Sequence, residues 1–201
     1  MMTMNRRLFC VSGLALMAAP AAAYPPRRLS EMLIEAAGRQ VGVTTRYDPS
    51  YTRLSFPNGD VPRAKGVCTD VIIRAYRDAF GIDLQALVNA DMRAAFSAYP
   101  KRWGLRSADR NIDHRRVPNL QTFFKRQGVQ RPIPQNEGLW KPGDIFTSLI
   151  GGTLPHIGIV SNNRDRAGRL LVIHNIGSGT RQENALFDHK ITGRYRWKVE
   201  A

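Results

Sequence analysis

The sequence predicts an α+β domain, with helices in the first part of the chain and an antiparallel sheet in the second. Apolar residues recur at helical spacing up to about residue 126. After Trp140, short runs rich in β-branched and aromatic residues alternate with glycine and asparagine pairs. The chain has 201 residues, of which 43% are hydrophobic and 23% charged, and this composition excludes a disordered chain.

The first predicted helix starts near Ser30, whose side chain we expect to cap it, and ends close to Gly42. Its apolar face consists of residues at helical spacing, namely Leu33, Ile34, Ala37 and Val41. A proline-containing loop follows and leads to the next helix.

Three further helices are expected before the strands begin. The second covers residues 67–80, and its apolar stripe consists of Val71, Ile72, Ala75, Tyr76 and Ala79. Asp83 is expected to cap the third, which runs to about Ala98. A basic connector over residues 101–116 leads to a shorter fourth helix over residues 120–126.

Four strands are predicted in the second part of the chain, at residues 144–149, 156–161, 170–175 and 191–197. The gaps between them are short, which favours antiparallel hairpins over helical crossovers. Because neither an internal repeat nor a flexible linker interrupts the chain, we expect a single domain over residues 24–201.

Residues 1–23 have the pattern of a cleaved export signal. Arg6 and Arg7 precede an apolar run of about a dozen residues, shorter than the ~20 needed to span a bilayer, and alanines end the segment. The paired arginines also resemble a twin-arginine signal. We therefore expect an exported, periplasmic protein without a membrane anchor after cleavage.

The net charge predicts an anionic partner. The whole chain carries +14, and the expected mature chain carries +12. Export and the absence of a recognition motif argue against nucleic acid, which leaves peptidoglycan or another anionic envelope polymer. We expect a monomer that needs no cofactor, and the four histidines lack the close spacing of a zinc site.

Cys68 is the single cysteine of the expected mature chain, so it has no internal disulfide partner. It is either a buried structural residue or a functional thiol. Its place at the first turn of a predicted helix favours a thiolate, because unpaired N–H groups and the helix dipole lower the pKa of such a thiol. The same N–H groups can stabilise an oxyanion.

A cysteine nucleophile needs a base and a group that orients the base. His156 begins one predicted strand, and His174 lies near the end of the next. If these strands pair antiparallel, the two imidazoles come close together. A histidine at a strand end without any role is the alternative for each of them taken singly.

Several motifs resemble known families. Four segments resemble the bacterial domain-of-unknown-function family number 1287, namely residues 66–71 (GVCTDV), 111–119 (NIDHRRVPN), 172–177 (VIHNIG) and 191–195 (ITGRY). The order of the Cys helix, a PGDI strand start, HIGIV and VIH also resembles NlpC-type papain-like cell-wall cysteine peptidases.

The resemblance implies a papain-like fold in which Cys68 is the nucleophile, His156 the base and His174 the orienting group. Asn175 competes with His174 for the third role, and neighbouring residues on a strand point to opposite faces. An upstream tyrosine hydroxyl often completes the oxyanion hole in this class. Tyr47 and Tyr51 are both candidates, and Tyr47 is preferred. The residues beside Cys68 depart from the usual Asp before it and Ser-Gly after it.

Four polar residues are candidates for substrate binding, namely Asp70, His114, Arg115 and Arg116. An arginine in this set is expected to clamp a substrate carboxylate, whereas the alternative for the connector residues is a solvated loop.

These observations favour an exported cysteine hydrolase that cleaves peptide amides in peptidoglycan, an endopeptidase rather than an amidase. A non-catalytic envelope-binding module and a cysteine-dependent acyl or amide transferase are the alternatives.

Overall fold

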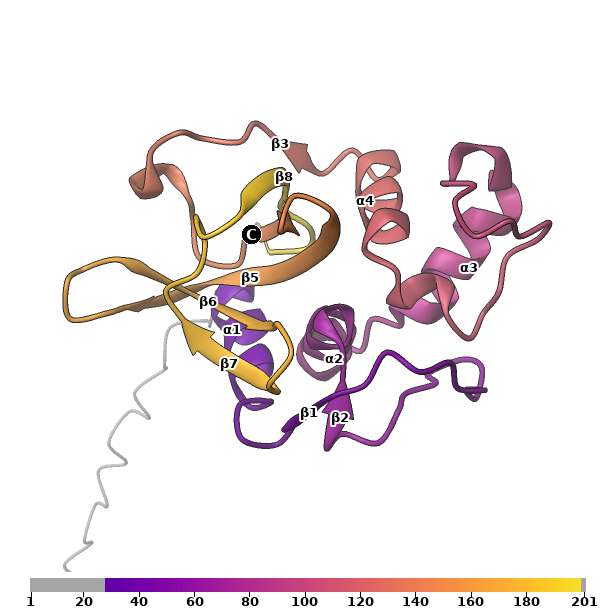
Figure 1. Ribbon diagram of the computed structural model, residues 1–201, viewed down its shortest axis with the longest axis horizontal. Helices are drawn as coiled ribbons and strands as arrows, with labels where there is room; N and C mark the ends of the chain where they lie inside the picture. Colours follow the sequence, from indigo (N-terminus) through magenta and orange to yellow (C-terminus); the bar gives the residue numbers. More distant parts are fainter. Residues whose placement is uncertain (1–27, 200–201) are drawn as a thin grey trace, which may run out of the picture.

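The structure is a computed structural model that describes residues 28–199 (Figure 1). In this part of the chain, α-helices precede and pack against a mostly C-terminal antiparallel sheet, so the predicted α+β class is confirmed. The predicted export signal at residues 1–23 lies outside the described residues. Within residues 28–199, none of the helices is both long and apolar enough to cross a membrane.

The described helices are α1 (Leu29–Gly38), α2 (Cys68–Phe80), α3 (Leu84–Ala94) and α4 (Val117–Arg126). The prediction for the ends of the first was wrong: Arg28 is its N-cap residue, and Ser30 lies within its first turn. Because α1 stops at Gly38, Val41 does not belong to its apolar face and is 43% exposed.

The predicted cap of α3 is confirmed, since the Asp83 carboxylate accepts a hydrogen bond from the Gln85 N–H. The helix is shorter than predicted, and a separate 3-10 turn, Phe96–Ala98, follows it. Conversely, α4 starts earlier than predicted because Pro118 fits the first turn of a helix, where no N–H is needed.

The main sheet has the strand order β3-β8-β4-β5-β6-β7, and all its described pairs are antiparallel. Its strands are β3 (Gln130–Arg131), β4 (Ile145–Ile150), β5 (Leu154–Arg164), β6 (Leu170–Asn175), β7 (Thr180–Glu183) and β8 (Lys190–Tyr195). The four predicted strands correspond to β4, β5, β6 and β8, whereas β3 and β7 are additional. Two short parallel strands, β1 (Arg46–Tyr47) and β2 (Lys65–Gly66), precede α2.

The two faces of the sheet bury different apolar clusters, because side chains alternate along each strand. Ile157, Ile159 and Ile173 pack in the larger core with residues of α1 and α2. The opposite face contributes a smaller cluster, which includes Phe146, Val160, Val172, Leu170, Trp140 and Leu186. Figure 1 shows α1 and α2 beside β5 and β6, with the segment of β1 and β2 next to the N-terminal end of α2.

Candidate active site

Cys68 is the first residue of α2; the residue is 4% exposed and lies at the wall of a pocket of about 250 Å³. The Asp70 carboxylate accepts a hydrogen bond of 2.6 Å from the Val67 N–H and so stabilises the start of the helix. The nucleophile candidate therefore sits on a rigid element rather than on a loop.

Burial raises the pKa of Cys68 to about 12, and the nearby Asp70 adds to this increase. Backbone N–H groups of Ile157, Thr69 and Cys68 itself favour the thiolate but do not offset burial. The expectation that the helix N-terminus alone lowers the pKa is thus wrong for this site, because the loss of hydration outweighs the helix dipole. At neutral pH the thiol keeps its proton and needs a base to react.

The structure brings His156 and His174 together, as their strands predict. His156 Nε2 lies 2.8 Å from His174 Nδ1, and both side chains are buried. In the register of β5 and β6, Gly158 pairs with His174, and His156 lies two residues before Gly158 on the same face. Burial lowers the pKa of His156 to about 3 and also lowers that of His174. Both imidazoles are therefore neutral near pH 7.

Gly158 leaves the space that this histidine pair needs. A Cβ atom there would lie 2.6 Å from the Phe146 ring and 3.0 Å from the Cβ of His174. The Phe146 ring also meets the His156 ring edge to face, with centroids 6.2 Å apart. The glycine in the HIGIV motif is thus required by close packing around the imidazoles.

Pro155 and Ile157, the neighbours of His156 on β5, approach the Cys68 thiol. Pro155 lines the same pocket as Cys68, and the N–H of Ile157 stabilises its thiolate. Within the described chain, Cys68 and His156 do not hydrogen-bond to each other. Catalytic hydrogen bonds are often long without substrate and tighten when it binds.

The two tyrosine candidates occupy different places. Tyr47 lines the pocket with Cys68, and burial, followed by Cys68, raises its pKa to about 12, so its hydroxyl remains a donor. The Tyr51 hydroxyl instead lies 3.1 Å from Asp109 Oδ2 and accepts a hydrogen bond from Asn111 Nδ2. The geometry therefore favours Tyr47 over Tyr51 as the donor beside the thiol.

No hydrogen bond joins Asn175 to His156 in the described chain, and Asn175 points to the face of β6 opposite to His174. Its Nδ2 donates a hydrogen bond of 3.1 Å to the Gly66 carbonyl oxygen, two residues before Cys68. Of the two competitors for the third role, His174 is the one that meets His156, and Asn175 holds the segment that enters α2.

Asp70 and Arg115 form an internal ion pair. Arg115 Nε and Nη2 each lie 2.9 Å from an oxygen of Asp70, and both side chains are buried. His114 is buried beside them, and burial lowers its pKa to about 4. The sequence analysis proposed these three residues for substrate binding. In the structure they connect the 3-10 turn Asp113–Arg115 to the start of α2, and Arg115 also borders the pocket.

Arg116 presents a different arrangement. It lines the pocket, its guanidinium lies 4.1 Å from the centre of the Trp103 ring, and Nη1 lies 3.0 Å from Asp113 Oδ1. Arg102 borders the same pocket. Sequence reasoning missed Trp103 and Arg102, which the connector pattern marked only as part of a basic segment.

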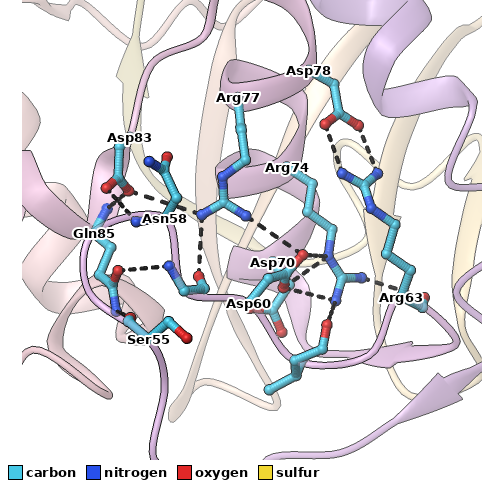
Figure 2. Close-up of polar contacts among 12 residues, drawn as sticks. Ser55, Asn58, Asp60, Arg63, Asp70, Arg74, Arg77, Asp78, Asp83 and Gln85 are labelled. Atoms are coloured by element: carbon cyan, nitrogen blue, oxygen red, sulfur yellow. Dashed lines mark hydrogen bonds and ion pairs between the residues drawn. The ribbon is translucent and has the colours of Figure 1, made fainter.

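The loop between β1 and β2 is held by a buried arginine of α2. Arg74 Nε and Nη2 lie 3.0 Å from the Asp60 carboxylate, and Nη2 also donates to the carbonyl oxygens of Val61 and Lys65. Figure 2 shows this cluster beside the more exposed pair of Arg63 and Asp78. Because this loop connects Tyr47 to Val67, Arg74 anchors the segment between two residues that line the pocket.

A further residue, Glu183 of β7, contacts the histidine pair. Its Oε1 lies 3.0 Å from His174 Nε2. No sequence pattern pointed to it, because β7 is a short polar strand without the apolar alternation that predicts strands. Among the described residues, there is no cluster of three or more His, Cys, Asp or Glu side chains arranged to hold a metal ion.

The fold and the site define an α+β chain with a buried cysteine at a helix start and a paired histidine on the adjoining sheet. The chain belongs to the family described as Domain of unknown function (DUF1287), whose model matches residues 34–197. It is similar to the uncharacterized protein YijF of Escherichia coli (strain K12), with 46% identity over 168 residues, which cover 84% of this chain and 82% of that protein.

Proposed function

We propose that this protein is an exported cysteine hydrolase of the NlpC-type papain-like class that cleaves peptide amide bonds in peptidoglycan stem peptides. The observation that carries the proposal is one arrangement. Cys68 begins a helix at a pocket wall, and its thiol meets β5 at Pro155 and Ile157. His156, which lies between these two residues, is linked to His174. A buried cysteine with a purely structural role needs neither the pocket nor the histidine pair.

In the first half of the proposed reaction, the Cys68 proton moves to Nδ1 of His156 while the sulfur attacks the amide carbon. The N–H of Cys68 and the Tyr47 hydroxyl stabilise the oxyanion. The C–N bond then breaks, the leaving nitrogen takes the proton from His156, and a thioester remains on the sulfur.

In the second half, His156 takes a proton from water, and the hydroxide oxygen adds to the thioester. The C–S bond breaks, the carboxylic acid leaves, and the sulfur recovers its proton from His156. The net change is the addition of one water molecule. Because the thiol and both imidazoles are neutral at rest, the proton moves during the attack and not beforehand.

The pocket wall supports a peptide substrate with a free carboxylate. Trp103 and Pro118 supply apolar surface, while Arg102 and Arg116 supply guanidinium groups near Cys68. Stem peptides carry free carboxylates, and arginine pairs with a carboxylate through two parallel hydrogen bonds. The expected mature charge of +12 acts in the same direction over the whole surface.

The first experiment is incubation of the protein without residues 1–23 with purified peptidoglycan and soluble muropeptides, followed by mass spectrometry. We expect new fragments whose masses account for one added water, and their complete loss in Cys68→Ala and His156→Gln. His189→Gln, a change outside the histidine pair, serves as the matched control and retains the activity.

Other outcomes identify the alternatives. Products that carry an added amine or peptide in place of water indicate a transferase. No products over a broad muropeptide set, with wall binding that survives Cys68→Ala, contradict the hydrolase and favour an envelope-binding module.

A further inference from the structure

A line of hydrogen bonds continues beyond the histidine pair. His156 Nε2 lies 2.8 Å from His174 Nδ1, and His174 Nε2 lies 3.0 Å from Glu183 Oε1. Both ring nitrogens of His174 are therefore engaged, one by an imidazole and the other by a carboxylate. Nδ1 of His156 is the nitrogen of this line that has no hydrogen bond within the described chain.

The register of the sheet produces this alignment. Glu183 on β7 pairs with Val172 on β6, and side chains two residues apart on a strand share a face. Glu183 therefore projects on the same face as Val172 and His174, diagonally next to the imidazole. The His174 side chain is 2% exposed, whereas that of Glu183 is 39% exposed, so the line runs from the buried pair to the surface.

We propose that Glu183 is a positioning residue that fixes the tautomers of both histidines, so that the unprotonated nitrogen of His156 is Nδ1. A carboxylate only accepts hydrogen bonds, so His174 must carry its proton on Nε2. Neutral His174 then has a lone pair on Nδ1 and accepts from Nε2–H of His156. Neutral His156 is left with its lone pair on Nδ1, where a base is needed. The assignment of His156 as base to Cys68 rests on the proposed function.

Without the carboxylate, the opposite arrangement becomes available. His174 can carry its proton on Nδ1 and donate it to His156 Nε2, which places the His156 proton on Nδ1. In that form His156 cannot take the proton of a thiol. Glu183 also stabilises the imidazolium that forms during the attack, because its negative charge lies one ring away.

Two other titratable groups face His174. Asp188 raises and His189 lowers its pKa through charge alone, and neither makes a hydrogen bond to the ring. Asp188 is exposed in the segment before β8, so Asp188→Asn is a matched control that removes a nearby carboxylate charge without removing the hydrogen bond.

The test compares wild type, Glu183→Leu, Glu183→Gln and Asp188→Asn by two readouts. Two-bond ¹H–¹⁵N spectra identify the protonated nitrogen of each histidine, and the rate of Cys68 alkylation by iodoacetamide is measured from pH 6 to 9. In wild type and Asp188→Asn, we expect protons on Nε2 of both rings. In Glu183→Leu, we expect Nδ1-protonated forms and alkylation at least about tenfold slower near pH 7.

Glu183→Gln keeps the size of the side chain and decides the matter if Glu183→Leu does not fold. Its amide can either donate to or accept from His174 Nε2, so the preference for a proton on Nε2 is lost, and we expect a mixture of tautomers and a slower alkylation. Unchanged tautomers in a folded Glu183 variant, or alkylation within twofold of wild type, overturn the proposal.

Neither readout uses a wall substrate. A protein that shows the expected tautomers and alkylation but cleaves no muropeptide keeps the role of Glu183 and loses the proposed function. A protein that cleaves muropeptides equally well with and without Glu183 keeps the function and loses this role.

Discussion

Burial controls the protonation of the candidate catalytic residues. Removing Cys68 from water raises the pKa of its thiol, and removing His156 from water lowers that of its imidazole. Both changes favour neutral side chains over a thiolate and imidazolium pair. A neutral thiol has little reactivity toward an amide, so donors that stabilise the oxyanion become more important at this site.

Tyr47 is the side-chain donor beside the thiol, so we expect Tyr47→Phe to lower kcat by about 10²-fold with little change in KM. The reason is that the hydroxyl stabilises charge that exists only in the transition state. Tyr51→Phe is the matched control, because its hydroxyl bonds to Asp109 and not to Cys68, and it should retain kcat within about twofold. Equal kcat values for the two variants, measured on the same muropeptide, contradict the role of Tyr47.

The N-terminal half of α2 organises the segments around the pocket. Asp70 pairs with Arg115 of the connector, and Arg74, one turn further, pairs with Asp60 of the loop between β1 and β2. The Arg74 side chain is fully buried and also donates to the backbone carbonyl oxygens of Val61 and Lys65. One helix therefore presents the thiol and anchors the two segments that carry Tyr47 and Arg116.

Arg74→Met should lower the free energy of unfolding by about 3 kcal/mol, because it leaves Asp60 and the loop carbonyls without their donor. Arg63→Met is the control, since Arg63 forms a more exposed pair with Asp78 and its loss should cost less than about 1 kcal/mol. Urea unfolding followed by circular dichroism measures both. A change for Arg74→Met as small as that for Arg63→Met would contradict the structural role of this arginine.

At the scale of the whole molecule, folding buries three histidines that are hydrated in the unfolded chain. Burial lowers the pKa of His114 to about 4 and that of His156 to about 3, and it also lowers the pKa of His174. Between these values and the ordinary histidine value near 6.5, the unfolded chain binds protons that the folded protein does not. Stability is therefore complete above about pH 6.5 and is lost as the pH falls.

We expect the free energy of unfolding to fall between pH 8 and pH 5, with His114 alone contributing about 2 kcal/mol of this decrease. In His114→Gln, the decrease should be smaller by that amount, whatever the variant's stability at pH 8. Tyr51→Phe is a control for the slope. Parallel pH curves for wild type and His114→Gln, from urea unfolding at several pH values, would show that His114 is not buried as the structure has it.

Local patterns predicted much of this molecule. The strands that carry His156 and His174 were recognised from their β-branched residues, and antiparallel pairing followed from the short gaps between them. The helix that starts at Cys68 was recognised from its apolar stripe. Polar elements are not predicted by such patterns: β7 has no apolar alternation, so Glu183 could not be placed. The predicted cap of α1 was wrong, because this helix starts after Arg28 without a side-chain cap.

The order of helices and strands, and the placing of the candidates Cys68, His156 and His174 on those elements, could be predicted from the sequence because hydrophobic periodicity is a local property of the chain. The tertiary structure alone decided that His174 rather than Asn175 meets His156, and that Arg115 pairs with Asp70. It also decided the protonation of the thiol. Each of these depends on distances between segments far apart in the chain and on the exclusion of water, which no local pattern encodes.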